Sequence, residues 1–213
     1  MFYLNHKAMK KKLILCLVSL LTVSVCFAQD YDYIWRNRYV NFGYANSTMH
    51  QDQGPDLKTY GGASFTIGRT YYLHSSIWGF FRFGIDATWL DLNYTSYRIK
   101  HITDYATNKY KYHQGEISVQ IGPSLTIRPF GDLNIHGFFR YAPAYSVLYA
   151  DNTLYGGYAT FFVGGGSISY GAIGLGFESR FGTSDYNDIL IGDAAATGKL
   201  GHKGWRAYLT FRF

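Results

Sequence analysis

The chain has 213 residues and a formal net charge of +6, and it contains 37 tyrosines and phenylalanines and 24 glycines but only four prolines. Tyr and Phe favour strands, and no apolar run of 18 residues follows residue 28. The composition therefore excludes a bundle of membrane-spanning helices and favours many strands and turns. The positive charge is concentrated near the N-terminus, so it is no indication of a nucleic-acid partner.

Residues 1–28 have the three parts of a secretory signal peptide. Lysines at 10–12 precede the apolar run LILCLVSLLTVSVCFA, which ends in the small residue Ala28. Met9 would be the more usual start of such a leader. Cleavage after Ala28 removes both cysteines and leaves 16 cations against 14 acids, a net charge of +2. The mature domain, residues 29–213, is then expected to have no disulfide and no cysteine-based site.

Eight segments of the mature chain alternate apolar and polar residues with the period of two that is typical of strands. The clearest segment reads GEISVQIGPSLTIRPF, and spacings of three and four, which a helix would need, are absent from it. The predicted strands are 38–45, 59–70, 77–90, 115–128, 133–149, 155–163, 168–182 and 204–213. An alternative makes 168–182 the sixth strand and 189–197 the seventh.

The connections between these strands alternate in length, as outer-membrane barrels require. The short ones are 71–76, 129–132 and 164–167. The long ones are 46–58, 91–114 and 183–203, with a modest one at 150–154.

One face of the predicted strands is broad and aromatic, and the other carries charged residues, Gly, Ser and Thr. The pattern alone allows either face to form a core. The signal peptide and four tryptophans near predicted strand ends favour the membrane, where the aromatic face would meet lipid. The sequence therefore predicts an all-β fold, a closed antiparallel transmembrane β-barrel of eight strands with a polar interior.

The final segment, WRAYLTFRF, keeps its two-sided pattern to the last residue. Together with the leader and the alternating strands, it resembles the small eight-stranded barrels of the bacterial outer membrane, the porin-like and OmpA/OmpX-like group. The resemblance implies contact with outer-membrane lipid and lipopolysaccharide, and insertion by the barrel-assembly machinery. Leu209, Phe211 and Phe213 would form the signal that this machinery reads. We expect a monomer.

The polar face of the strands places charged side chains inside the barrel. Eight strands enclose an interior that side chains can just fill, and buried charges must be paired. We therefore predict an interior polar plug made of Arg82, Asp86, Glu116, Gln120, Arg140 and Arg206. Further inward positions are His136, Glu178, Arg180 and Tyr208. The predicted register sets position 86 opposite about 119 and position 120 opposite about 141, which brings Asp86, Gln120 and Arg140 into one row.

The connection 91–114 is rich in tyrosine and cations. Such residues could stack on sugars or bind lipopolysaccharide phosphates, although a soluble loop without a ligand is the plainer alternative. The residues of this possible surface-binding loop are Tyr97, Arg98, Lys100, Lys109, Tyr110 and Lys111.

Catalytic and cofactor motifs are not found in the sequence. Possible acid–base residues at the extracellular rim are His50, Asp52, Asp91, His101, Asp104 and His113. They come without a nucleophile elbow or an HExxH motif, and GAIGLG at 171–176 lies inside a predicted strand. We expect a structural or surface-interaction protein with no cofactor or metal. The alternatives are a narrow channel for small solutes and a lipid- or peptide-hydrolysing enzyme with a rim active site.

Overall fold

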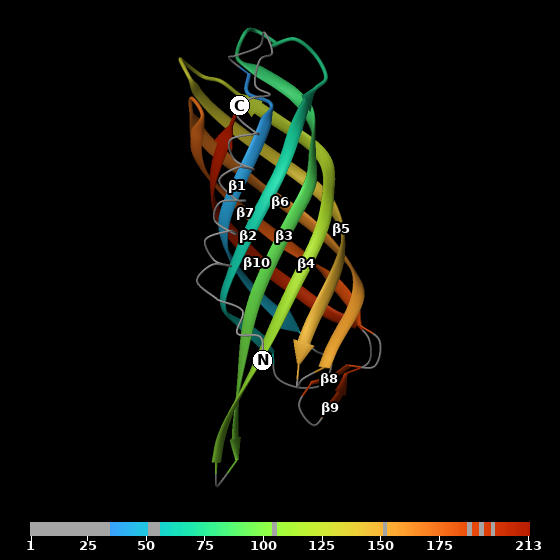
Figure 1. Ribbon diagram of the computed structural model, residues 1–213. Helices are drawn as coiled ribbons and strands as arrows, with labels where there is room; N and C mark the ends of the chain where they lie inside the picture. The colour runs from blue at the N-terminus through green and yellow to red at the C-terminus, as the bar shows by residue number, and fades with distance from the viewer. Residues whose placement is uncertain are drawn as a thin grey trace, which may run out of the picture. The chain divides into compact units, whose positions relative to one another are not determined.

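The computed structural model describes residues 35–50, 56–103, 106–150, 153–186, 189–191, 194–196 and 199–213. The predicted signal peptide lies outside these residues. Residues 37–212 form one compact unit, a closed antiparallel barrel of eight strands (Figure 1). Its strands are β1 (Arg38–His50), β2 (Leu57–Tyr72), β3 (Phe81–Thr103), β4 (Ala106–Ile127), β5 (Leu133–Ala150), β6 (Thr153–Tyr170), β7 (Ile173–Tyr186) and β10 (Lys199–Arg212).

The strands close in the order β1-β10-β7-β6-β5-β4-β3-β2, so β1 and β10 form the seam. The predicted fold class is therefore confirmed. Two short strands, β8 (Ile189–Ile191) and β9 (Ala194–Ala196), pair in a separate small sheet between β7 and β10 along the chain. The alternative that used 189–197 as a barrel strand is wrong. In the described part of the chain, no helix has the length and apolar character needed to span a bilayer.

Side chains alternate between the lumen and the outer surface along each barrel strand. On β5, His136 and Arg140 are 2% exposed, whereas Phe139 and Tyr141 are 48% and 41% exposed. The same alternation exposes Ile117, Val119 and Ile121 on β4, and it leaves the outer wall aromatic and aliphatic. This wall is the apolar side of the predicted pattern, and the polar side faces inward.

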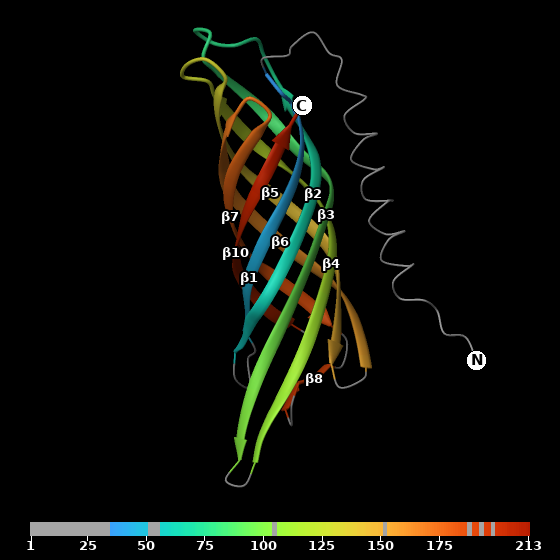
Figure 2. The ribbon, with the colours of Figure 1, turned by 60° about the vertical axis from the view of Figure 1, so that its left-hand side comes forward.

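The two ends of the barrel carry different connections between strands. The β2–β3, β4–β5 and β6–β7 connections lie at one end, which we name the turn end, and the other connections lie at the loop end. At the loop end β3 and β4 continue past their neighbours as a long hairpin (Figures 1 and 2). This hairpin is paired without interruption from Asp91 opposite Ser118 to Thr103 opposite Ala106.

The predicted loop 91–114 is therefore wrong, since most of it is strand. A bulge between Thr88 and Asp91 explains the error. Trp89 is exposed and Leu90 is half-buried, so the alternation changes phase there, and it resumes with Asp91 buried and Leu92 exposed. A bulge inserts one extra residue and shifts the period of two, which makes the strand seem to end in the sequence.

The predicted turn at 164–167 is also wrong, because β6 continues through it to Tyr170. The chain turns at Gly171 instead, whose φ of +60° is readily adopted by glycine. The glycines before it are needed for close packing: a Cβ atom on Gly165 would lie 2.6 Å from the Cβ of Glu178 on β7. Gly165 and Gly166 thus reflect crowding between strands, and the run of three glycines does not mark a turn.

Two tyrosine rings lie over glycines on the neighbouring strand inside the barrel. Tyr39 is paired with Gly68 and Tyr208 with Gly176. A Cβ atom on either glycine would overlap the tyrosine ring opposite it. Glycine at these positions therefore makes room for a bulky ring within a narrow lumen.

We predict that Gly176→Val destabilises the barrel by about 1–3 kcal/mol, because the new side chain would displace the Tyr208 ring from a filled interior. The free energy of unfolding would be measured by urea titration in lipid vesicles. Gly137→Val is the matched control, since nothing lies within 4 Å of a Cβ atom placed there. Equal effects of the two replacements would contradict this packing.

Candidate functional site

The lumen is filled by inward side chains, and Asp86 is the centre of the layer nearest the turn end. Its carboxylate accepts a hydrogen bond of 2.5 Å from the hydroxyl of Tyr39 on β1 and lies 2.7 Å from Nε2 of His136 on β5. Arg140 Nε is 3.7 Å from the same carboxylate. Arg140 also donates 2.9 Å and 3.2 Å bonds to Gln120 and Thr88. This layer ties β1, β3, β4 and β5 together.

The predicted row of Asp86, Gln120 and Arg140 is therefore brought together, but through a different register. Asp86 lies opposite Gly122, and Gln120 lies opposite Thr88. On the next strand pair it is Ile121, one residue on, that faces Tyr141. The predicted pairing of 86 with 119 is wrong because it places the hairpin loop directly after Leu90 and omits the bulge. The long arginine side chain spans the remaining distance.

The next layer is centred on Asp91, which Arg206 binds through both terminal nitrogens at 2.8 Å and 3.2 Å. Arg206 also lies 3.1 Å from Glu178, so one guanidinium serves two carboxylates. Ser118 and Gln120 donate further bonds of 2.9 Å and 2.8 Å to Asp91. All five side chains are buried. Buried charges need partners of opposite charge or hydrogen bonds, and these contacts provide them.

Asp91 had been expected at the extracellular rim, and that expectation is wrong. It is 1% exposed, in the middle of the network. The bulge before it reverses which residues of this stretch face inward.

A third layer surrounds Glu116. Arg180 pairs with it, Asn93 donates a 2.9 Å bond and Gln114 a 3.2 Å bond. The Arg180 guanidinium also stacks on Phe161, with 3.6 Å from its carbon to the ring centroid. A cavity of about 20 Å³ adjoins Arg180, which is room for about one water molecule.

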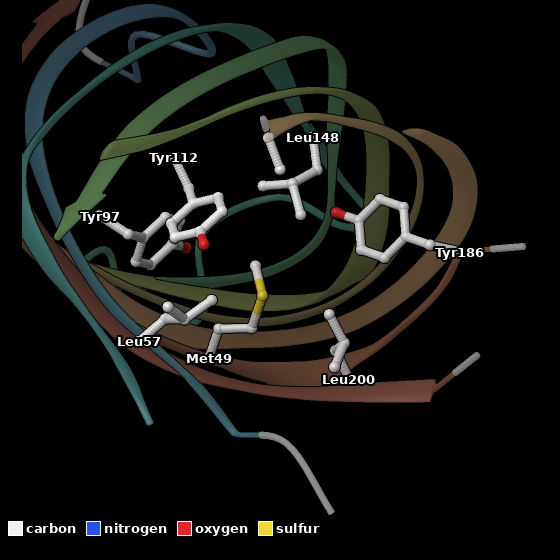
Figure 3. Close-up of a cluster of buried hydrophobic side chains, with 8 residues drawn as sticks. Met49, Leu57, Tyr97, Tyr112, Leu148, Tyr186 and Leu200 are labelled. Atoms are coloured by element: carbon white, nitrogen blue, oxygen red, sulfur yellow. The ribbon is translucent and has the colours of Figure 1, made fainter. Parts of the chain in front are cut away.

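The layer at the loop end is apolar, which the sequence did not suggest. We name it the stopper, and Figure 3 shows its larger side chains pointing toward one another across the barrel. Its residues are Met49, Leu57, Tyr97, Tyr112, Leu148, Ala150, Tyr186 and Leu200. Gln114 connects it to the polar layers, because it accepts a 2.7 Å bond from the Tyr97 hydroxyl and donates a 2.9 Å bond to that of Tyr186.

The remaining predicted interior residue, Arg82, is half-buried close to the turn end. Its guanidinium carbon lies 5.3 Å from the ring centroid of Tyr72. Of the proposed assembly signal, Leu209 and Phe211 lie on the outer face of β10, and Phe213 follows that strand in the chain.

The predicted surface-binding loop is divided by the structure. Tyr97 is fully buried in the stopper, so its assignment to a surface loop is wrong. The other five residues, Arg98, Lys100, Lys109, Tyr110 and Lys111, lie on the paired backbone of the β3–β4 hairpin, and their side chains are outside the described part.

The proposed rim residues whose side chains are described do not converge. His50 pairs with Asp56 at 2.9 Å, and His113 is bonded to the hydroxyl of Tyr94 at 2.7 Å. Asp52 and Asp104 lie outside the described residues, and so does the side chain of His101.

The apolar outer wall is suited to contact with lipid. The polar side chains of the lumen pair with one another and do not need bulk water. A closed barrel also leaves no sheet edge unpaired in hydrocarbon. This architecture is that of a membrane-spanning β-barrel. Its lumen contains buried ion pairs and, at the loop end, the stopper.

No protein-family model matches this barrel, and no curated protein matches it in sequence. Similar solved structures include Ail, the attachment invasion locus protein of Yersinia pestis, at 12% identity over 84% of this chain and 99% of that one, with a TM-score of 0.44. Neisserial surface protein A has 12% identity over 83% and 97% of the two chains, with a TM-score of 0.49. The outer membrane protease OmpT of Escherichia coli has 10% identity over 83% and 97%, with a TM-score of 0.48. These similarities concern the fold.

We predict that Tyr39→Phe lowers the free energy of unfolding by about 1.5–3 kcal/mol, because it removes a buried hydrogen bond to a charged carboxylate. Tyr44→Phe on the same strand is the control. Tyr44 is exposed on the outer wall, and its replacement should change stability by less than about 0.5 kcal/mol. Urea titration of both variants in lipid vesicles would measure the difference, and an unaffected Tyr39→Phe barrel would exclude Asp86 as the centre of its layer.

Proposed function

We propose that the protein is a closed, non-conducting outer-membrane barrel, a structural scaffold that holds an interaction surface outside the cell. The observation that supports this most directly is that the lumen is filled twice in series. Between the stopper and the turn end, three buried carboxylates are each paired with an arginine: Asp86, Asp91 and Glu116. Opening a path would require both the apolar packing and these ion pairs to be lost.

A narrow channel for small solutes is the second candidate. Polar groups line the lumen between the stopper and the turn end. They would suit a hydrated path if the stopper and the paired side chains moved aside. We favour the closed barrel because each arginine is held by more than one contact. Arg206 binds two carboxylates, and Arg180 both pairs with Glu116 and stacks on Phe161. A rim hydrolase has weaker support, since Asp91 is buried in the lumen and the proposed rim residues with described side chains, His50 and His113, pair with different partners, Asp56 and Tyr94.

We further propose the route by which the barrel reaches the membrane. The predicted leader at 1–28 would export the chain, and the barrel-assembly machinery would recognise the final strand through Leu209, Phe211 and Phe213. In barrels of this kind the longer loops face outward, so the loop end and the β3–β4 hairpin would lie outside the cell. The hairpin is then the element available to partners.

We predict that the refolded protein gives no steady conductance in planar bilayers, because two fillings close the lumen in series. Removing either the stopper or the ion pairs alone should not open the lumen. A Met49→Ala/Leu148→Ala/Leu200→Ala variant keeps the ion pairs, and an Arg140→Ala/Arg180→Ala/Arg206→Ala variant keeps the stopper. Only the combination of the two sets should conduct small ions.

Steady conductance steps from the unaltered barrel would contradict the closed scaffold and favour the narrow channel. Each preparation would first be checked by comparing unboiled and boiled samples on a gel. A folded closed barrel resists detergent until it is heated, so the two should migrate differently.

A further inference from the structure

A small cavity adjoins the Glu116 layer on the side of the β1–β10 seam. It has a volume of about 20 Å³ and is lined from the seam by Ala45 of β1 and His202 of β10. Asn93 of β3 and Arg180 of β7 line it from within the layer. A buried water molecule needs about 10–15 Å³ of such space and two to four polar partners, so the volume suits one water molecule.

Arg180, which is 7% exposed, has hydrogen-bond donors that its neighbours do not use. Its nitrogen Nη1 pairs with Glu116, and its guanidinium carbon lies 3.6 Å from the ring centroid of Phe161. The other two nitrogens, Nε and Nη2, are buried and have no hydrogen-bond partner among the described residues. The ion pair and the stack hold the planar guanidinium in place, so it cannot turn toward other acceptors without losing both contacts.

Asn93 has an unused hydrogen-bond acceptor at the same cavity. Its side-chain nitrogen donates a 2.9 Å bond to Glu116. A carboxylate only accepts hydrogen bonds, so this contact fixes the orientation of the amide and leaves its oxygen for another partner. The oxygen is buried and has no hydrogen-bond partner within the described part of the chain. The cavity is thus lined by one residue with unsatisfied donors and by another with an unsatisfied acceptor.

The charges around the cavity decide which small ligand fits it. Among the described residues, the Asp91 and Glu116 layers hold three carboxylates, Asp91, Glu116 and Glu178, against the two guanidiniums of Arg180 and Arg206. An anion would add a further negative charge to this buried excess, and a cation would lie against the N–H groups of Arg180. A water molecule avoids both costs, because it can accept a bond from the guanidinium and donate one to the amide oxygen.

We propose that the cavity binds one water molecule, which bridges Arg180 and Asn93 and completes the hydrogen bonding of the Glu116 layer. The water links β7 to β3, two strands that are not neighbours in the barrel, so it acts as a bridge across the lumen. Its binding requires only these two side chains and the cavity. The site therefore goes beyond the closed scaffold, and recordings in planar bilayers do not decide it.

The direct test is a crystal structure of the refolded barrel at a resolution that shows ordered water, from an untreated crystal and from one soaked in sodium bromide. We expect one peak of electron density in the cavity, about 2.7–3.2 Å from a nitrogen of Arg180 and from the side-chain oxygen of Asn93. The soaked crystal should give no anomalous signal there. An anomalous peak would overturn the water and indicate an anion site. A cavity without density would overturn the site altogether.

Two variants at Ala45 test the same site by urea titration in lipid vesicles. Ala45 is 2% exposed and lines the cavity, so a larger side chain there would take the space of the water. Ala45→Thr and Ala45→Val introduce side chains of nearly the same shape, and only the threonine hydroxyl can replace the hydrogen bonds of the displaced water. We expect the threonine variant to unfold at a urea concentration about 0.5 M higher than the valine variant.

Ala142 provides the matched control, because it is buried in an apolar cluster that includes Phe138, Phe161 and Val163. A threonine hydroxyl there would be buried among apolar side chains, so Ala142→Val should unfold at a urea concentration equal to or higher than Ala142→Thr. The same order at Ala45, with valine equal to or more stable than threonine, would overturn the water site. If neither Ala45 variant folds, the crystal structure of the unaltered barrel decides.

Discussion

The Arg206 guanidinium joins three strands of the barrel across the lumen. Arg206 belongs to β10, the last strand, and it binds Asp91 of β3 and Glu178 of β7. Since β10 also forms the seam with β1, this one cation connects the seam to strands on both sides of it. Three buried charges in a lumen this narrow are tolerable only together, because an unpaired buried ion costs several kcal/mol. The position of Arg206 thus depends on the register of all three strands.

The inner and outer surfaces of the barrel both follow from the alternation of side chains along each strand. Inward residues meet one another, so every charge needs a partner and the lumen becomes filled. Outward residues meet the bilayer, so the wall is apolar over its middle and changes to aromatic and then cationic residues near the loop end. Trp205 and Lys203, two residues apart on β10, mark this change on one strand. In the proposed closed barrel, the outer wall and the loop end are the surfaces where the protein can act.

Much of the fold could be predicted from the sequence, because a period of two reports directly which face each residue takes. Asp86, Glu116, Gln120, Arg140 and Arg206 were placed inward by that period, and the structure has them buried. The period gives no warning of a bulge, so Asp91 and Tyr97 were assigned to a loop. Pattern also cannot tell glycines that relieve crowding, as at Gly165, from glycines in a turn. The stopper was missed because Met49, Leu57 and Leu200 lie where strands were expected to have ended.

A double-mutant cycle on Asp91 and Arg206 tests the central claim, that buried ion pairs hold the closed lumen together. The free energies of unfolding of the unaltered barrel, Asp91→Leu, Arg206→Met and the double variant would be measured by urea titration in lipid vesicles. Arg206→Met leaves Asp91 and Glu178 without their cation, and Asp91→Leu leaves Arg206 with Glu178 alone. The account therefore predicts a coupling energy of about 1–3 kcal/mol and a double variant more stable than the sum of the single losses implies. Additive losses, within about 0.5 kcal/mol, would show that the two side chains do not interact and would contradict the account.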